Sequence, residues 1–476
     1  MIIKQSSSSK ISNTLVILPK WHIKFDNKNH KEFFQNHMKL KKWQKYVVSH
    51  ITELKNKKLY YTIFVKLNNL KWFNENIEDI VASVWDEIKS INKNFLIDLN
   101  KTDLNNVDKN LFQELLTIKL YHYDKFKSES DSPQQLVFKN KHYSKHKFEN
   151  FVDSINSVRD LVNTPANELN PQIFQDYIKK EVKSIKNLSI QIIDSNKLKE
   201  LGLNWIYQVG KWSDVPPRLI ILKYQPNKKQ GFKFWLVWKW VCFDTGGYNI
   251  KPTGFMEDMK IDMWWAWTVF GVWKYLAKIG YQDNFVVAMP LVENMISSKA
   301  YKPWDIIKMY NWKTVEVWNT DAEWRLTLAD SLAYIQDNFK PKYMIDIATL
   351  TWAQLIALWN KIWAIIGNNL QLNKKLQKIS WNIKERFWEL PLYKPYFKSN
   401  KSFAADMNSI PSFGKAGPGT ISAWLLLSEF VENKNWVHLD IAWPVGIFSG
   451  SDPLWWEWAS GFGFRALINF INSVQD

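Results

Sequence analysis

Three charged residues at alternate positions in the second half of the chain could act together chemically. They are Asp321, Glu323 and Arg325, which follow a predicted strand at residues 313–317 and precede a helical pattern at residues 326–339. If the backbone is extended here, all three side chains lie on one face, because strand side chains alternate. Carboxylates crowd together only around a compensating cation, and clustered carboxylate oxygens suit divalent metal ions. The alternative is an acidic helix entry that faces water.

A second charged group lies upstream, around a glycine turn at residues 245–247. It consists of Lys239, Asp244, Lys251 and Asp262. An apolar run at residues 234–237 predicts a strand before Lys239, and two further predicted strands precede Asp321 and Asp346. In sheets of this kind ligands bind beyond the carboxyl ends of the strands, so these residues could converge at one edge. The presence of two such groups favours a binding site over a solvated acidic turn.

Together the two stretches resemble the catalytic signature of the leucyl aminopeptidase (cytosol aminopeptidase) family, a group of two-metal exopeptidases. The resemblance extends from about residue 152 to the C-terminus, and further matching segments lie at residues 159–167 and 346–351. Several spaced motifs occur in the family's order, which makes the similarity specific. The resemblance implies an enzyme that hydrolyses the N-terminal residue from short peptides, with a Leu-like preference, through a hydroxide that bridges two divalent metals.

The resemblance also implies a role for each residue of the site. Two divalent ions per subunit, Mn²⁺ or Zn²⁺, would be held by Lys239, Asp244, Asp262, Asp321 and Glu323. Lys251 would donate to the oxyanion of the tetrahedral intermediate, and Arg325 would bind a bicarbonate ion that acts as base toward the attacking water. Asp262 would also hold the α-amine of the substrate. The peptide would further contact Thr349, Leu350, Thr351 and Met259.

Tryptophan stands in this chain at many positions where the family has glycine. These positions are Trp238, Trp240, Trp264, Trp265, Trp267, Trp318, Trp324, Trp352, Trp443, Trp455, Trp456 and Trp458. Glycine is used where φ is positive or where two backbones nearly touch, and an indole fits neither situation. We therefore hypothesise that the source reads UGA as glycine and that the printed sequence translates UGA as tryptophan. Trp388 and Trp436 stand where the family accepts an aromatic residue, and a genuinely Trp-rich protein is the alternative.

The composition leaves the partners of the chain open. Its 476 residues carry a formal net charge of +17, which could imply nucleic acid or an anionic surface. Lysine is abundant together with Asn and Ile, as in an AT-rich coding sequence, so codon bias is the favoured cause and a basic nucleic-acid-binding oligomer is the alternative. No stretch predicts a signal peptide or a membrane span. The single cysteine, Cys242, fits a reducing compartment, so a cytoplasmic enzyme is expected.

The pattern of apolar runs predicts an α/β protein with two domains. Residues 1–148 form a smaller N-terminal α/β domain, which in the family chiefly supports assembly, expected here to be a homohexamer. Residues 149–170 form an interdomain helix and hinge, and residues 171–476 form the larger catalytic domain. Helices alternate there with continuously apolar strands, which favours a mixed sheet flanked by helices. Strands are expected at residues 188–193, 219–222 and 285–289, and a polar loop is expected at residues 125–146.

Overall fold

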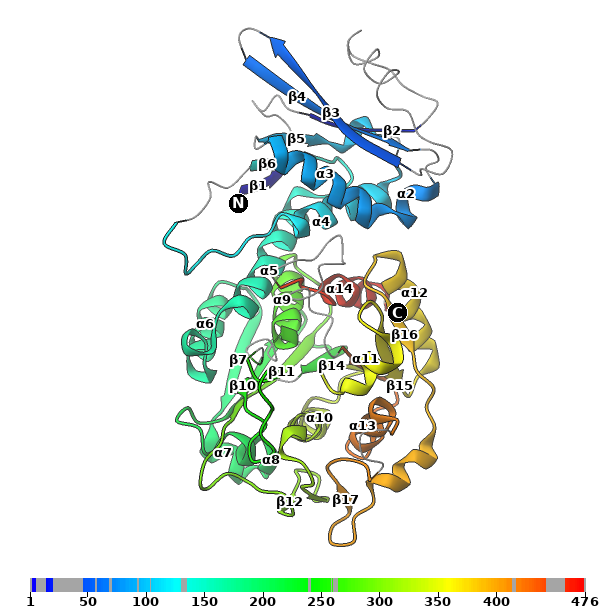
Figure 1. The fold of residues 1–476 in the computed structure, drawn as a ribbon. Coiled ribbons are helices and arrows are strands. Elements are labelled where there is room, and N and C mark those ends of the chain that lie inside the picture. The colour runs from blue at the N-terminus through cyan, green and yellow to red at the C-terminus, as the bar shows by residue number, and fades with distance from the viewer. Residues whose placement is uncertain are drawn as a thin grey trace. The chain divides into compact units, whose positions relative to one another are not determined.

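The computed structural model divides the chain into two compact units (Figure 1). One unit comprises residues 1–156 with 445–460, and the other comprises residues 157–444 with 461–476. The described residues are 2–5, 14–19, 46–55, 58–67, 71–91, 94–102, 104–129, 135–238, 241–257, 259, 264–412, 417–441 and 459–474. Two of the predicted metal ligands, Lys239 and Asp262, lie outside the described residues.

The first unit contains a six-stranded sheet. Its strand order is β1 (Ile2–Gln5), β6 (Gln135–Lys139), β5 (Phe95–Asp98), β2 (Thr14–Pro19), β4 (Lys58–Leu67) and β3 (Tyr46–Lys55). The unit also contains α2 (Lys71–Glu75), α3 (Ile77–Ile91) and α4 (Asn106–Lys119). The prediction of a polar loop over residues 125–146 is wrong at β6, whose Leu136, Val137 and Phe138 are buried. So short a strand gives a weak signal when both of its flanks are polar.

The second unit is built on a nine-stranded mixed sheet. In order, the strands are β16 (Phe387–Glu389), β15 (Trp363–Gly367), β18 (Trp436–Asp440), β14 (Tyr343–Ala348), β9 (Phe234–Trp238), β11 (Phe285–Asn294), β8 (Arg218–Tyr224) and β7 (Leu188–Ile193), with β10 (Val241–Asp244) paired to β11. β9, β10, β11, β14 and β18 run parallel, so their carboxyl ends lie at the same edge. β8 and β15 run antiparallel to their neighbours β11 and β18. The predicted α/β class with a mixed sheet is confirmed.

Helices cover the sheet, and both faces of its central strands are buried. Trp235 of β9 belongs to one large apolar core with Leu326 of α10 (Trp324–Phe339), whereas the preceding Phe234, which points to the opposite face, is buried as well. The other helices are α5 (Lys145–Asn163), α6 (Pro171–Lys183), α7 (Ser195–Glu200), α8 (Asn204–Gly210), α9 (Trp264–Lys278), α11 (Trp352–Leu358), α12 (Leu370–Asn382), α13 (Gly419–Ser428) and α14 (Phe464–Ser473). Among the helices described, none is both long enough and apolar enough to cross a membrane.

A small three-stranded sheet supports the approach to α10. It consists of β12 (Ile306–Lys308), β13 (Thr314–Glu316) and β17 (Met407–Asn408). β12 and β13 form an antiparallel pair, and β17 adds to β13 in parallel. β13 lies within the strand predicted at residues 313–317, and α10 covers the helix predicted at residues 326–339.

Candidate metal centre

Four segments of the second unit meet beyond the carboxyl ends of β10 and β11. β10 ends at Asp244 and β11 ends at Asn294, and these two residues are partners in the strand register. A 3-10 turn, η4 (Thr320–Ala322), leads into α10 and brings Asp321 and Glu323 to the same place. The loop that follows β10 supplies Lys251. The structure thus brings together residues from both of the charged groups.

Three carboxylates form the centre of this site. Asp244, Asp321 and Glu323 each offer one oxygen atom, and the three atoms lie within 4.8 Å of one another. Asp244 and Glu323 are fully buried, whereas 27% of the Asp321 side chain is exposed. The ammonium group of Lys251 pairs with two of them: Nζ lies 3.1 Å from Asp244 Oδ2 and also bonds to Asp321 Oδ1. The cluster therefore carries its own compensating cation.

The backbone through Asp321, Glu323 and Arg325 is helical, so the prediction of an extended conformation is wrong. The side chain of Asn319 accepts a hydrogen bond from Asp321 N at 2.8 Å, which starts the turn of η4 one residue later. Side chains capping the first turn in this way favour helical over extended backbone. Asp321 and Glu323 share a site because the chain turns there, and Glu323 stands at the N-terminus of α10, where the helix dipole favours negative charge.

The Gly246–Gly247 turn holds the loop after β10 against η4. Thr320 Oγ1 donates to the carbonyl oxygen of Gly246 at 2.6 Å and accepts from Asn249 N at 2.8 Å. Both glycines have positive φ, +83° and +63°. A Cβ atom on Gly246 would lie 2.5 Å from the carbonyl oxygen of Asn249 and 3.1 Å from Asp321 Oδ1. Glycine is therefore required here both by conformation and by close approach to the carboxylate.

Asn294 and Tyr301 belong to the site, although neither lies in either of the two charged stretches. Asn294 is fully buried, and its Nδ2 donates to Asp244 Oδ1 at 2.8 Å and to Glu323 Oε2 at 3.1 Å. The hydroxyl of Tyr301 lies 2.7 Å from the carbonyl oxygen of Thr320. Burial, together with the negative charges of Glu323 and Asp244, raises the pKa of Tyr301 well above its ordinary value, so it stays a neutral donor. A polar residue at the carboxyl end of a long apolar strand was the available signal for Asn294.

Arg325 is buried in the first turn of α10, two residues beyond Glu323. Only 8% of it is exposed, and its Nε and Nη1 have no hydrogen-bond partner among the described residues. Burial lowers the pKa of Arg325 to about 10, while the nearby charges of Asp440 and Glu323 act in the opposite direction. A buried guanidinium with unused donors is suited to holding a small anion.

The predicted substrate segment at residues 349–351 follows β14 and is held by the neighbouring strand. Asp440, the last residue of β18, accepts from Leu350 N at 3.0 Å and from the hydroxyl of Thr351 at 2.6 Å. Leu350 and Thr351 are buried and Thr349 is half-buried. Burial raises the pKa of Asp440, and these hydrogen bonds oppose that effect. Met259 is buried too, and its backbone N–H donates to the carbonyl oxygen of Met256. Contact between Met259 and the substrate stays a prediction.

Asp346, which was expected to follow its strand at this edge, lies inside β14 and serves another purpose. It is fully buried and lies 2.5 Å from Nδ1 of His438, its register partner on β18. Burial by itself would lower the pKa of His438, but the charge and hydrogen bond of Asp346 outweigh it, so the pKa is raised. This pair ties two parallel strands together and is not part of the carboxylate cluster.

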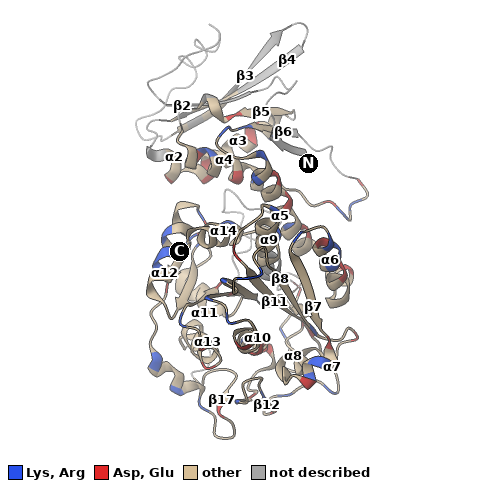
Figure 2. Ribbon diagram, turned by 180° about the vertical axis from the view of Figure 1, so that it is seen from behind, with Lys and Arg blue, Asp and Glu red and all other residues tan. Residues whose placement is uncertain are grey.

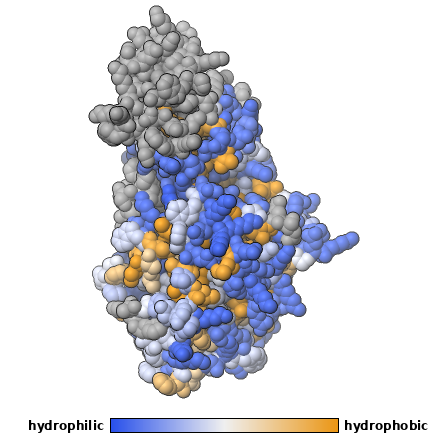
Figure 3. All heavy atoms as spheres, turned by 90° about the vertical axis from the view of Figure 1, so that its right-hand side faces the viewer, coloured by the Kyte–Doolittle hydropathy of each residue, from blue (hydrophilic) through white to orange (hydrophobic). Residues whose placement is uncertain are grey.

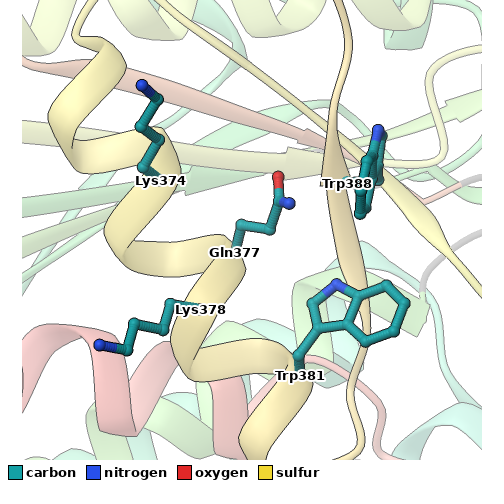
Figure 4. Close-up of a pocket in the computed structure, with 5 residues that line it drawn as sticks. All are labelled: Lys374, Gln377, Lys378, Trp381 and Trp388. Carbon is teal, nitrogen blue, oxygen red and sulfur yellow. The ribbon is translucent and has the colours of Figure 1, made fainter.

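The open pocket in Figure 4 lies elsewhere on the second unit. Its volume is about 230 Å³, and it is lined by Lys374, Gln377, Lys378 and Trp381 of α12 and by Trp388 of β16. The two indole rings meet edge to face with centroids 5.9 Å apart. On the face of the molecule shown in Figure 3, hydrophilic residues predominate and hydrophobic residues gather near the middle. None of the residues that line this pocket belongs to the carboxylate cluster.

The carboxylate cluster fits a divalent cation by the chemistry of its donors. Carboxylate oxygens are ligands for Mg²⁺ and Mn²⁺, and Zn²⁺ accepts them as well. Burying carboxylates this close together is costly unless positive charge lies beside them. The ammonium group of Lys251, which pairs with Asp244 and Asp321, shows that the cluster accommodates a cation. Three protein oxygens do not complete the coordination of such an ion. Lys239 and Asp262 remain the predicted additional ligands.

Comparison with known proteins places the chain in a family. Residues 156–468 match the family described as cytosol aminopeptidase family, catalytic domain. The chain is 39% identical over 301 residues to a probable cytosol aminopeptidase of Pseudomonas fluorescens, covering 63% of this chain and 60% of that protein. It is 38% identical over 352 residues to a probable cytosol aminopeptidase of Azotobacter vinelandii, covering 72% of this chain and 70% of that protein.

Solved structures show the same fold over almost the whole chain. The cytosol aminopeptidase from Coxiella burnetii is 25% identical with a TM-score of 0.84, covering 100% of this chain and 99% of that one. The bottromycin maturation enzyme BotP in complex with Mn is 24% identical with a TM-score of 0.82, covering 98% of this chain and 100% of that one. The chain belongs to the cytosol aminopeptidase family. The prediction of a metal-dependent aminopeptidase, a hydrolase, is confirmed at the level of this family.

Proposed function

We propose that the protein releases N-terminal residues, with a Leu-like preference, from short peptides at a two-metal site in the cytoplasm. The observation that carries this proposal is the meeting of Asp244, Asp321 and Glu323 beside Lys251 and the buried Arg325. These residues come from two distant stretches of the chain, and the arrangement combines cation ligands with groups that stabilise negative charge.

Two divalent ions, Mn²⁺ or Zn²⁺, would be held by the three clustered carboxylates together with Lys239 and Asp262. Asp244 and Glu323 are the buried pair and would be shared between the two ions. When bound, two such ions supply hydroxide near neutral pH because they lower the pKa of the water between them. The presence of Mn in the structure of BotP supports the choice of metal.

The chain's own cations would act on the negative charge that develops during hydrolysis. Lys251 would donate to the oxyanion of the tetrahedral intermediate. Its Nζ reaches Asp244 and Asp321, so it stands at the rim of the place where the scissile carbonyl would lie. Arg325 would hold a bicarbonate ion as base, and its unpartnered Nε and Nη1 support this role.

The substrate would be fixed at its N-terminal residue. Asp262 would bind the α-amine, which confines hydrolysis to the first residue. The segment at residues 349–351, held by Asp440, would bind the peptide backbone, and Met259 would border the side-chain pocket. The family resemblance further supports a homohexamer with residues 1–148 as the assembly domain.

Hydrolysis of leucine p-nitroanilide tests this function. Activity should be lost with chelator and restored by Mn²⁺. Glu323→Gln should abolish activity while leaving the circular dichroism spectrum unchanged, because a neutral amide of the same shape replaces one ligand. A folded protein that hydrolyses no peptide with any added metal would refute the proposal.

The second candidate is a basic oligomer that binds nucleic acid, motivated by the net charge of +17. Figure 2 shows basic and acidic residues close together on α6 and α7. Lys197 Nζ lies 2.8 Å from Glu200 Oε2, and Lys179 Nζ lies 3.7 Å from Asp176 Oδ1. Such mixed surfaces favour codon bias as the source of the lysines. Steeply salt-dependent DNA retention that is unaffected by Glu323→Gln would support this alternative.

We also propose that many of the printed tryptophans are glycine in the native protein. Among the described residues, three tryptophans have positive φ: Trp304 at +76°, Trp312 at +72° and Trp359 at +61°. Two of them stand where glycine is usual: Trp312 lies in the turn between β12 and β13, and Trp359 lies directly after α11. With ψ of −161°, Trp359 occupies a region that is almost exclusive to glycine. These backbone conformations support recoding of UGA as glycine.

Other positions give no such support. Trp318, Trp324 and Trp352 are described and do not have positive φ. Trp240, Trp443, Trp455, Trp456 and Trp458 lie outside the described residues, as do the side chains of Trp238, Trp264, Trp265 and Trp267. The intact mass of the natively expressed protein tests the proposal, since each Trp that is glycine removes about the mass of an indole side chain. A mass that matches the printed chain would refute it.

A further inference from the structure

Asn294 joins the two buried carboxylates of the candidate metal centre. Its Nδ2 lies 2.8 Å from Asp244 Oδ1, 3.1 Å from Glu323 Oε2 and 3.1 Å from the carbonyl oxygen of Thr320. The two N–H groups of one amide are thus shared among three acceptors. Two of these acceptors belong to carboxylates on different segments, the end of β10 and the start of α10. Asn294 is the described residue that donates to both of them.

The surroundings hold the Asn294 amide in this orientation. The hydroxyl of Tyr301 lies 3.2 Å from Asn294 Oδ1 and 2.7 Å from the carbonyl oxygen of Thr320. The single proton of this hydroxyl is shared between the two acceptors, and a donor on the oxygen side of the amide leaves its nitrogen side to face the carboxylates. Gly247 permits the fit, because a Cβ atom there would lie 3.2 Å from Asn294 Oδ1 and 3.1 Å from Thr320 Oγ1.

We infer that Asn294 is a positioning residue that orients Asp244 and Glu323 for metal binding. This inference rests on the proposed metal function. Both carboxylates are fully buried, so their orientation depends on protein donors and not on water. The amide occupies one oxygen of each carboxylate, and the second oxygen of Asp244, Oδ2, lies 3.1 Å from Lys251 Nζ, on the cation side of the cluster. Removing a side chain that hydrogen-bonds to a metal ligand commonly weakens metal binding about 10- to 100-fold.

The same amide also reduces the repulsion between the two carboxylates when they are brought together. A neutral donor shared by both lowers the cost of placing two negative groups side by side without adding a positive charge that would compete with the metal. Lys251 supplies charge from the more exposed side, where 11% of its side chain is accessible. Asn294 therefore acts from the interior and Lys251 from the rim.

Titration of the full chain with Mn²⁺ tests the inference. Asn294→Leu keeps the approximate shape of the side chain and removes its donors, and we expect the Kd for Mn²⁺ to rise about 10- to 100-fold. Peptidase activity of this variant should recover at high Mn²⁺ concentration, with the half-saturating concentration shifted by the same factor. Tyr301→Phe removes only the hydroxyl and should weaken Mn²⁺ binding in the same direction to a smaller extent.

Asn284, the residue directly before β11, provides the matched control at the opposite end from Asn294. It is also buried, and its Nδ2 donates to the carbonyl oxygens of Asn227 and Gln230 at 2.7 Å, with no contact to the carboxylates. Asn284→Leu should lower stability and leave the Kd for Mn²⁺ unchanged. A purely structural role for Asn294 would give this same result.

The outcomes separate the inference from the function on which it rests. If the unmodified protein binds no Mn²⁺, the proposed function fails. If it binds Mn²⁺ and Asn294→Leu binds equally well, the function stands and the inference is overturned. Should Asn294→Leu not fold, Tyr301→Phe decides: weaker Mn²⁺ binding supports the positioning role, and an unchanged Kd overturns it.

Discussion

Replacing Gly246 by alanine should disturb the candidate metal centre through a single methyl group. Gly246 has φ of +83°, and a non-glycine residue in this region costs about 1–2 kcal/mol. The new Cβ would lie 2.5 Å from the carbonyl oxygen of Asn249, a backbone atom that cannot move freely. Relieving such an overlap adds about 1–3 kcal/mol. Together these costs predict a loss of about 2–5 kcal/mol in the free energy of unfolding.

Gly254 separates the conformational cost from the steric one. It lies in the same loop and has φ of +89°, and a Cβ atom added there would meet no other atom within 4 Å. Gly254→Ala should therefore cost only about 1–2 kcal/mol. The difference between the two variants measures the steric overlap at Gly246.

The overlap should also reach the metal site. The same Cβ would lie 3.1 Å from Asp321 Oδ1, so this carboxylate must shift by a few tenths of an ångström. A shift of this size uses up much of the roughly 0.5 Å within which ligand geometry must be held. We expect weaker Mn²⁺ binding for Gly246→Ala and unchanged binding for Gly254→Ala, measured by calorimetric titration, with stability measured by urea denaturation. Equal destabilisation of both variants with equal Mn²⁺ affinity would refute this account of the loop.

Three further changes test other parts of the structure. Trp359→Gly should raise the free energy of unfolding by about 1–3 kcal/mol, because it relieves backbone strain at a side chain that is 68% exposed. As a control, Trp381→Gly within α12 should lower the free energy of unfolding by about 1 kcal/mol or more in the same denaturation assay. A gain in stability for both variants would show that strain at Trp359 is not the cause. Burial raises the pKa of Asp330 to about 7, so the folded state keeps a proton that the unfolded state releases near pH 4. Stability should therefore fall as pH rises from about 4 to 7, by up to on the order of 4 kcal/mol. Asp330→Asn should flatten this pH dependence in denaturation curves recorded across that range. Thr351→Val removes one hydrogen-bond donor to the buried Asp440 and should lower the free energy of unfolding by about 1–3 kcal/mol. Thr420→Val keeps the Thr351–Asp440 hydrogen bond and should lower stability less in thermal unfolding. The reverse order would count against Asp440 as the anchor of residues 349–351.

Residue type and chain order were sufficient to predict much of this protein. The strand at residues 188–193 and the helix at residues 326–339 were visible because apolar periodicity follows from which side chains must be buried. Asp244, Asp321 and Glu323 could be singled out as candidate metal ligands because ligand chemistry belongs to the residue itself, and the structure brings them together. The α/β class followed from the alternation of helices with continuously apolar strands.

Local conformation at the site was harder to predict from the chain alone. Alternating charges at residues 321–325 suggested an extended backbone, but the side chain of Asn319 caps a helical turn. β6 was missed because its three buried residues gain their stability from neighbouring strands, which a local pattern does not reveal.

By itself, the sequence determined which chemical groups the protein possesses and roughly where strands and helices occur. Only the tertiary structure decided which of those groups meet. Asn294 became part of the site because β10 and β11 pair in a register that places it beside Asp244. Thr320 became part of it because its hydroxyl hydrogen-bonds to Asn249, which lies 71 residues earlier in the chain. Asp346 was excluded because its strand neighbour is His438. The physical reason is that hydrogen bonds between distant segments depend on register and packing, which are properties of the whole fold.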